Sequence, residues 1–198
     1  MSFESESIST NLLAGLRGNK LEGWKRLMAL FAPTVCNWAR QQGLQEADAT
    51  DVTQEVFLSV FKRIDEFERT CEKHTFRGWL YSITRRKVLD HFRKLKKTPT
   101  GRGGASASQW LLNLPDKPEI DAVDPDPEGT ARGLAQRGLE LIRSDFEPRT
   151  WRAFHAVVMD GRSASDVAAE SGMTVGAIHA AKCRIMKRLR EEFGGWVL

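Results

Sequence analysis

Apolar side chains recur at intervals of three and four residues across positions 51–97, and this spacing constrains the fold of the 198-residue chain more than any other feature. Such spacing gathers the apolar residues on one face of a helix, whereas a half-buried strand would need strict alternation. The first stripe consists of Val52, Val56, Val60, Phe61, Ile64 and Phe67. The second consists of Phe76, Trp79, Leu80 and Ile83. We therefore predict two amphipathic helices, separated by an irregular polar segment at residues 65–75.

Similar stripes precede this stretch, so the whole N-terminal half is predicted to be helical. The apolar residues there are Leu12, Leu13, Leu16, Trp24, Leu27, Met28, Phe31, Val35 and Trp38. Pro33 is expected to begin a new helix and Gly43 to end it, because these residues favour those two positions. Together the segments predict a helical bundle over residues 8–97, which is large enough to bury a core of its own.

Residues 98–130 are predicted to form a flexible linker, because glycine, proline and serine at this density disfavour packed secondary structure. The linker contains six acids, and a simple interpretation is that they keep a tether solvated. These acids are Asp116, Glu119, Asp121, Asp124, Asp126 and Glu128. The linker also carries an apolar patch that a bare tether does not need, made of Trp110, Leu111, Leu112 and Leu114.

Residues 131–194 are predicted to form a second, smaller helical domain, so the fold class is all-α with two domains. Two helices are indicated by Leu134, Leu139, Leu141, Ile142 and Phe146, and then by Trp151, Phe154, Val157 and Val158. Ser163 can cap a short third helix, and Gly172 is placed to stop it. Thr174 can cap a longer fourth helix whose inward residues are Val175, Ile178, Ile185 and Leu189. This succession is a helix-turn-helix pattern.

In a helix-turn-helix the second helix inserts its N-terminal half into the major groove of DNA. Small outward residues at its start would let the helix approach the bases closely. Arg184 is the best candidate for a bidentate contact with guanine, and the nearby lysines and arginines suit phosphates. The predicted DNA-contact residues are Thr174, Ala177, His179, Ala180, Lys182, Arg184, Lys187 and Arg188.

A second cationic surface is predicted on the helix that begins at Phe76. Asp90 is the one acid among residues 77–97, which favours a surface that follows phosphates over a general solubility device. Its predicted nucleic-acid contacts are Arg77, Arg85, Arg86, Lys87, Arg93, Lys94 and Lys97. His74 could contact DNA or be a solvated loop residue, and Trp79 fits a core anchor better than a base-stacking platform.

The helix before it carries a mostly polar stripe on the side opposite its apolar face. The stripe consists of Asp51, Gln54, Glu55 and Leu58, at i, i+3, i+4 and i+7. One interpretation is a solvated helix face. The other, which we favour, is a docking surface in which carboxylates fix the register of a basic partner.

Three segments resemble a known family in the right order. The run DVTQEVF resembles the acidic D-x-x-Q-E motif of extracytoplasmic-function (group IV) sigma factors, FRGWLYSITRRKVLDHFRK resembles their region 2 segment for the minus-ten promoter element, and GRSASDVAAESGMTVGAIHAAKCRIMKRLREEF resembles their region 4. Ala180 and Ala181 stand where relatives often carry Ser, Arg or Lys, so the set of base-reading residues does not carry over intact. Recognition there would depend more on backbone contact and DNA shape.

The resemblance implies a function for each segment. The acidic motif would dock on a coiled coil of the large subunit of core RNA polymerase, and the loop at residues 65–75 would capture a flipped base of the non-template strand. The second domain would read the minus-thirty-five element, and the acidic linker would thread through the polymerase. The expected partners are core RNA polymerase, promoter DNA and an anti-sigma factor or other regulator. The apolar patch would pack on one domain or on the polymerase.

The remaining features restrict other classes of function. A stand-alone helix-turn-helix regulator is the alternative, but it would not need the acidic motif and usually dimerises. An enzyme is not expected, because Asp90, His91, His155 and Asp160 show no metal-ligand spacing, and no catalytic residue, cofactor or metal is predicted. Cys71 and His74 likewise lack two further zinc ligands.

Charge and composition agree with this interpretation. A net charge of +4 and a pI near 9.1 are compatible with nucleic-acid binding without establishing it. No apolar run approaches the ~20 residues of a membrane span, and the N-terminus is polar and acidic. The three scattered cysteines, Cys36, Cys71 and Cys183, fit reduced thiols, so a cytoplasmic location is expected.

Overall fold

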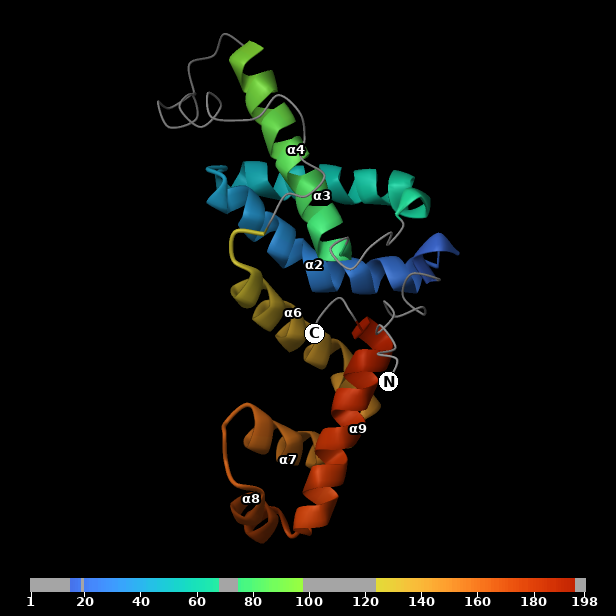
Figure 1. Ribbon diagram of the computed structural model, residues 1–198, viewed down its shortest axis with the longest axis vertical. Coiled ribbons are helices and arrows are strands. Elements are labelled where there is room, and N and C mark those ends of the chain that lie inside the picture. Colours follow the sequence, from blue (N-terminus) through green and yellow to red (C-terminus); the bar gives the residue numbers. More distant parts are fainter. Residues whose placement is uncertain (1–14, 19, 68–74, 98–123, 195–198) are drawn as a thin grey trace, which may run out of the picture. The chain divides into compact units, whose positions relative to one another are not determined.

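The computed structural model describes residues 15–18, 20–67, 75–97 and 124–194 (Figure 1). Every regular element within these ranges is an α-helix or a short 3-10 helix, which confirms the all-α prediction. The chain divides into two compact units. The described residues of the N-terminal unit lie within Ala14–Gly133, and those of the C-terminal unit lie within Leu134–Leu198.

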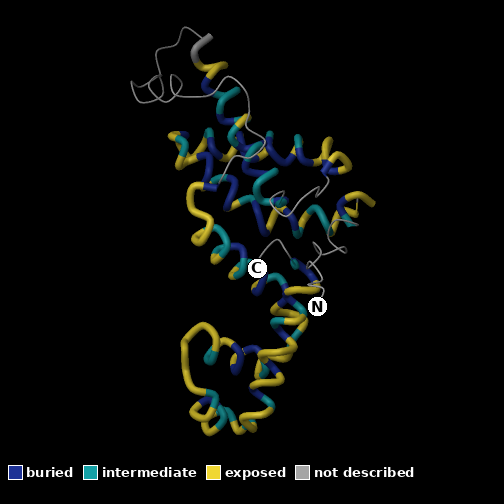
Figure 2. The backbone as a smooth tube through the Cα atoms, viewed as in Figure 1, coloured by how far each residue is buried: buried dark blue, intermediate teal, exposed yellow. Residues whose placement is uncertain are grey.

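Three long helices form the N-terminal unit: α2 (Leu21–Gln41), α3 (Glu46–Arg63) and α4 (Phe76–Lys97), with the 3-10 helix η1 (Ile64–Glu66) extending α3. All three helices pack on one another, and their facing sides are buried (Figures 1 and 2). The side chains of this core include Leu27, Leu30, Phe31, Val35, Trp38, Val56, Val60, Phe76, Leu80 and Val88. The predicted bundle is therefore present, with the apolar stripes of α3 and α4 turned inward.

Two predictions about this bundle are wrong. Pro33 does not begin a helix but lies inside α2, exposed to solvent. Phe31, Thr34 and Val35 are buried on both sides of it, and their burial outweighs the roughly 3 kcal/mol that an interior proline costs. Phe61 was assigned to the apolar stripe of α3, but it is 50% exposed and packs at a tilt against Trp24, with ring centroids 5.1 Å apart. Gly43 does end the helical segment, with a φ of +95°.

An aromatic cluster joins the end of η1 to the start of α4. Phe67 and Phe76 meet at right angles with ring centroids 5.4 Å apart, and Trp79 lies 5.1 Å from Phe67 and 5.6 Å from Phe76. Phe31 of α2 contacts the same cluster through Phe76. Trp79 therefore serves as a packing anchor, as predicted, and the cluster joins Phe67 to Phe76.

The C-terminal unit consists of α6 (Pro127–Ile142), whose first turns belong to the N-terminal unit, η2 (Arg143–Asp145), α7 (Pro148–Val158), α8 (Ala164–Ser171) and α9 (Val175–Phe193). Gly138 of α6 allows the close approach of α9, because an added Cβ would lie 3.0 Å from Leu189 and 3.2 Å from Phe193. Ala153, Val167 and Ile178 bring α7, α8 and α9 together. Phe146, predicted to lie in the first helix, instead follows η2.

The boundary predicted for the linker at residue 130 is wrong at its C-terminal end. Helix α6 already begins at Pro127, because proline suits the first helical position and the Asp126 carboxylate accepts a hydrogen bond from the Gly129 amide at 2.9 Å. Several predictions concern residues outside the described ranges. These are Leu12, Leu13, Cys71, His74, the side chain of Lys97, Trp110, Leu111, Leu112, Leu114, Asp116, Glu119 and Asp121.

Candidate functional site

The helix-turn-helix of the C-terminal unit is capped as its sequence predicts. The Ser163 hydroxyl accepts from the Asp166 amide at the start of α8, and the Thr174 hydroxyl accepts from the Ala177 amide at the start of α9, both at 3.1 Å. Gly172 ends α8 with a φ of +63°, in the left-handed region where glycine is favoured. The two caps and this glycine fix where the longer helix begins.

Arg149 adds a contact that sequence patterns did not indicate. Its guanidinium donates hydrogen bonds to the carbonyls of Ser171 and Gly172, at 2.8 and 2.7 Å. These are carbonyls at the end of α8 that have no partner within the helix. Arg149 of α7 thus ties down the turn that positions α9.

Most of the predicted contact residues of α9 are exposed together. His179, Ala180, Lys182, Arg184 and Lys187 are all exposed, whereas Ile178, Ala181, Ile185 and Leu189 are buried. Lys182 and Arg184 make no hydrogen bond or ion pair with any residue that the structure describes. Thr174 and Ala177 contribute chiefly to the cap. Val175 was predicted to point inward, but it is 42% exposed because it lies in the first, outermost turn of α9.

Arg188 was predicted to contact a phosphate, and its contacts indicate a structural role instead. Its guanidinium donates to Asp145 at 2.9 Å and to Glu192 at 2.6 Å. Glu192 is almost fully buried, so Arg188 neutralises a carboxylate that the fold has removed from water. No sequence signal identified this pairing, because Asp145 lies 43 residues away.

The polar stripe of α3 divides into a free and an engaged part. Asp51, Gln54 and Leu58 are exposed, and Leu58 has an exposed fraction of 61% despite being apolar. Glu55 instead faces α4 and forms ion pairs with Lys87 and Lys94, each at 3.4 Å. Two helical turns before Glu55, a carboxylate oxygen of Asp48 lies 3.8 Å from Nε2 of His91. The predicted docking carboxylate thus meets two of the predicted DNA-binding lysines.

These lysines change the acidity of Glu55. Burial tends to raise the pKa of its carboxyl group. Hydrogen bonds and charge attraction from Lys87 and Lys94 together lower the pKa by more than burial raises it, so it lies below its ordinary value of 4.5. Glu55 is therefore ionised throughout the physiological range.

The predicted cations of α4 do not share one face. Successive helical residues turn by about 100°, so Arg86 and Arg93 lie on one side while Arg77, nine residues before Arg86, lies on the opposite side. The buried residues Tyr81, Thr84 and Val88 are on the side of Arg77. Arg86 and Arg93 are exposed, and Arg93 pairs with Asp90 at 3.5 Å. Arg85 is half-buried and lies near Tyr81. Burial raises the pKa of the Tyr81 hydroxyl.

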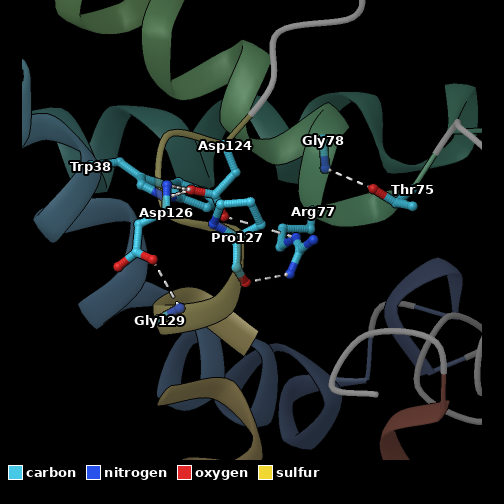
Figure 3. A network of polar contacts seen from close by, with 8 residues as sticks. All are labelled: Trp38, Thr75, Arg77, Gly78, Asp124, Asp126, Pro127 and Gly129. Atoms are coloured by element: carbon cyan, nitrogen blue, oxygen red, sulfur yellow. Dashed lines mark hydrogen bonds and ion pairs between the residues drawn. The ribbon is translucent and has the colours of Figure 1, made fainter. Parts of the chain in front are cut away.

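Arg77 belongs to a buried polar contact that joins α2, α4 and the segment before α6 (Figure 3). The indole N–H of Trp38 donates to the Asp124 carboxylate at 3.0 Å, and the Arg77 guanidinium lies 3.9 Å from the other oxygen of that carboxylate. Arg77 also donates to the Pro127 carbonyl at 3.3 Å. The Asp124 side chain is only 5% exposed, so the interpretation of this acid as part of a solvated tether is wrong.

Within the described ranges, no three His, Cys, Asp or Glu side chains are grouped so that they could hold a metal ion. Among those same residues, none of the helices has the length and apolar character needed to cross a membrane. The geometry therefore presents three features: an exposed acidic and apolar edge on α3, a cationic side on α4, and a helix-turn-helix.

Comparison with known proteins connects these features. Residues 27–98, which include α3 and α4, match the family model for Sigma-70 region 2. Sequence similarity extends further, to the ECF RNA polymerase sigma factor SigE of Mycolicibacterium smegmatis, with 30% identity over 86% of this chain and 62% of that protein. Residues 27–98 thus match Sigma-70 region 2, and most of the chain is similar to extracytoplasmic-function sigma factors.

Other members of the family match over similar lengths. SigF of Caulobacter vibrioides is 27% identical, over 91% of this chain and 90% of its own, and CnrH of Cupriavidus metallidurans is 28% identical over 83% of each. The chain spans less than two thirds of the first two relatives, 62% of SigE and 63% of BldN of Streptomyces coelicolor. The solved structure of CnrH in complex with the cytosolic domain of CnrY aligns over 91% of this chain, with 19% identity and a TM-score of 0.37.

Proposed function

We propose that this chain binds core RNA polymerase, directs it to promoters and helps to melt DNA at the start of transcription. The observation that carries the proposal is the exposed edge of α3, with Asp51, Gln54 and Leu58, within the segment that matches Sigma-70 region 2. An isolated helix-turn-helix regulator has no need of such an edge. In this role the chain has no catalytic chemistry of its own and acts in the cytoplasm.

Each part of the chain has a role in this proposal. The bundle, residues 8–97, docks on the polymerase through Asp51, Gln54, Glu55 and Leu58 and holds the minus-ten strand. Its proposed strand contacts are His74, Arg77, Arg85, Arg86, Lys87, Arg93, Lys94 and Lys97. The helix-turn-helix domain, residues 131–194, grips the minus-thirty-five duplex through α9, led by Lys182 and Arg184. The intervening linker is proposed as residues 98–123, shortened because Asp124 packs on the bundle and α6 begins at Pro127.

Two weak DNA contacts become specific in such an assembly because the polymerase holds both domains on one promoter. The second contact then forms at a high effective concentration and needs little affinity of its own. An anti-sigma factor is a further proposed partner, since the relative CnrH has been solved in complex with the cytosolic domain of CnrY. Such a regulator would compete for the docking edge or the DNA surfaces.

Run-off transcription with purified core polymerase on a promoter library tests the proposal and returns the promoter sequence. The informative variant is Asp51→Lys, because Asp51 is exposed and its replacement leaves the pairs of Glu55 intact. Glu140→Lys, an equal charge reversal on an exposed residue of α6, is the matched control.

We expect Asp51→Lys to lower the affinity for core polymerase by about tenfold, equivalent to about 1.4 kcal/mol, while Glu140→Lys leaves it unchanged. Circular dichroism of both variants should match the wild type. Equal polymerase affinity for Asp51→Lys and the wild type would refute the docking assignment. Specific promoter binding by the free chain, without transcription by the added polymerase, would favour the stand-alone regulator.

A further inference from the structure

The contact between Asp124 and the bundle uses a carboxylate in an unusual way. One carboxylate oxygen accepts from the Trp38 indole and from the Asp126 amide, both at 3.0 Å. The other oxygen is fully buried and makes no hydrogen bond to any described residue, although the Nε atom of Arg77 lies 3.9 Å away. An ionised carboxylate normally accepts hydrogen bonds at both oxygens, so this one is held by charge without a complete set of donors.

The surroundings of Asp124 are those of an anion site. The groups that face the carboxylate are N–H donors, the guanidinium of Arg77 and the indole of Trp38, together with the ring of Tyr81, which packs on Trp38 at 5.1 Å. The first turn of α4 contains no acidic residue of its own, so its free amides add a partial positive charge. Asp124 supplies the missing negative charge from a different segment of the chain (Figure 3).

The position of this site links it to the proposed DNA surface. Arg77 lies in the first turn of α4, two residues after Thr75, whose hydroxyl accepts from the Gly78 amide at 3.0 Å. Thr75 is the last residue of the segment 65–75, which is proposed to capture a base of the melted strand. A strand held there would bring its phosphates to the first turn of α4, away from Arg86 and Arg93 on the other side of the helix.

We propose that Arg77 and the Trp38 indole form an anion site that Asp124 fills in the free chain and that a phosphate of single-stranded DNA fills in the bound chain. Arg77 can offer a phosphate a bidentate pair of hydrogen bonds, which the geometry around Asp124 lacks. Asp124 is then an internal competitor that lowers the affinity of the free chain for DNA. The proposal rests on the proposed function, in that it requires the bundle to bind a single strand.

The variant that tests it is Asp124→Asn. Asparagine keeps the shape of the side chain and an oxygen that can accept from Trp38, but it removes the charge that competes for Arg77. The matched control is Glu128→Gln, which removes the same charge four residues later from an exposed position that forms no ion pair with Arg77. Thermal unfolding of both variants checks that the bundle remains folded.

Fluorescence anisotropy would measure binding of a labelled random-sequence DNA single strand of roughly 12 nucleotides, both to the free chain and to its complex with core polymerase. We expect Asp124→Asn to bind the strand about three- to tenfold more tightly than the wild type and Glu128→Gln to bind it like the wild type. Arg77→Ala should weaken binding and reduce the slope of log affinity against log salt by about 0.7. In the Arg77→Ala background, Asp124→Asn should give no gain.

A second readout follows Trp38 itself. In ¹⁵N-labelled chain the indole resonance of Trp38, assigned with Trp38→Phe, should move on addition of the strand, because a phosphate then replaces the Asp124 carboxylate as the acceptor of the indole N–H. Binding of the strand without this movement would overturn the proposal, as would a gain for Asp124→Asn that persists without Arg77 or is equalled by Glu128→Gln. Failure of the proposed function is recognised separately, since the wild-type chain would then give no run-off transcript with core polymerase.

Discussion

The candidate nucleic-acid cations of the two units differ in what they contact within the chain. In the N-terminal unit, Lys87 and Lys94 pair with Glu55, and Arg77 lies against Asp124. In the C-terminal unit, Lys182 and Arg184 of α9 make no such pair with a described residue. If both surfaces bind DNA as proposed, Lys87, Lys94 and Arg77 would exchange carboxylates for phosphates, whereas Lys182 and Arg184 would need no such exchange.

This difference agrees with the two kinds of DNA proposed as ligands. A duplex offers its phosphates and base edges in a fixed geometry, so a preformed recognition helix can dock on it directly. A melted strand becomes available only on the polymerase, and a surface that pairs internally until then is shielded from unspecific nucleic acid. Lys87, Lys94 and Arg77 of the bundle thus lie beside carboxylates of the same unit. The capping and packing of α9 leave Lys182 and Arg184 exposed.

The largest expected effect concerns the exposed cations of α9. Arg184→Ala should lower the affinity of the polymerase-bound chain for the minus-thirty-five duplex by about 1–3 kcal/mol, because the arginine is exposed and available for a base. Electrophoretic mobility shifts on promoter DNA would measure the change, and the unfolding free energy should stay the same.

Arg188→Ala is the contrasting variant on the same helix. Because Arg188 neutralises Asp145 and the buried Glu192, its loss should lower the unfolding free energy by about 1–3 kcal/mol in urea titrations. If Arg184→Ala and Arg188→Ala changed DNA affinity and stability alike, the distinction between contact and support residues on α9 would be wrong.

A smaller effect is expected from the arginine that ties the turn of the helix-turn-helix. Arg149→Ala removes two hydrogen bonds to the carbonyls of Ser171 and Gly172, and should cost about 1–2 kcal/mol of stability, since both partners are exposed to water in the variant. Arg152→Ala, an exposed arginine of the same helix, is the control. Hydrogen exchange should show faster opening of the amides at the start of α9 in Arg149→Ala only. Equal exchange rates in the two variants would show that Arg149 does not help to position α9.

The sequence was sufficient where structure depends on neighbours along the chain. The helices at positions 51–97, the caps at Ser163 and Thr174 and the stop at Gly172 follow from spacing and local hydrogen bonding, and all of them are present. The exposed set on α9 follows from the same periodicity. Helical period alone therefore located most of the proposed DNA-facing side chains.

Contacts between distant residues could not be predicted in this way. Nothing near Asp124 in the sequence indicates that Trp38, 86 residues earlier, will donate to it, and nothing near Arg188 indicates Asp145. The same limitation grouped Arg77 with Arg86 as one cationic face, since charge was counted along the chain without the angle around the helix. Pro33 was misassigned because the packing of α2 against two other helices overrides its local preference.

A modest effect is expected for the lysines of α4 that pair with Glu55. Glu55→Gln keeps the shape of the side chain but releases Lys87 and Lys94 from a charged partner, so the affinity for a DNA single strand should rise by about two- to threefold, which is less than 1 kcal/mol. Asp51→Asn removes an equal charge from the same helix without touching these lysines and should have a smaller effect. Anisotropy titrations at low salt would measure both. An equal gain for the two variants would attribute the effect to net charge and not to the Glu55 pairs.

The smallest expected effect is the pH dependence of the same contact. Lys87 and Lys94 hold the pKa of Glu55 below its ordinary value of 4.5 against the opposing effect of burial, so the folded chain releases this proton more readily than the unfolded chain. The stabilisation is then fully present above pH 4.5 and is lost as the pH falls through the lower pKa of the folded state. Because the Glu55 side chain is 43% exposed, its size should be below about 1 kcal/mol. Urea titrations should therefore show the wild type slightly more stable than Glu55→Gln at pH 7, with the difference shrinking steadily below pH 4.5. A difference that stays constant down to low pH would mean that shape at position 55, and not its charge, stabilises the packing of α3 on α4.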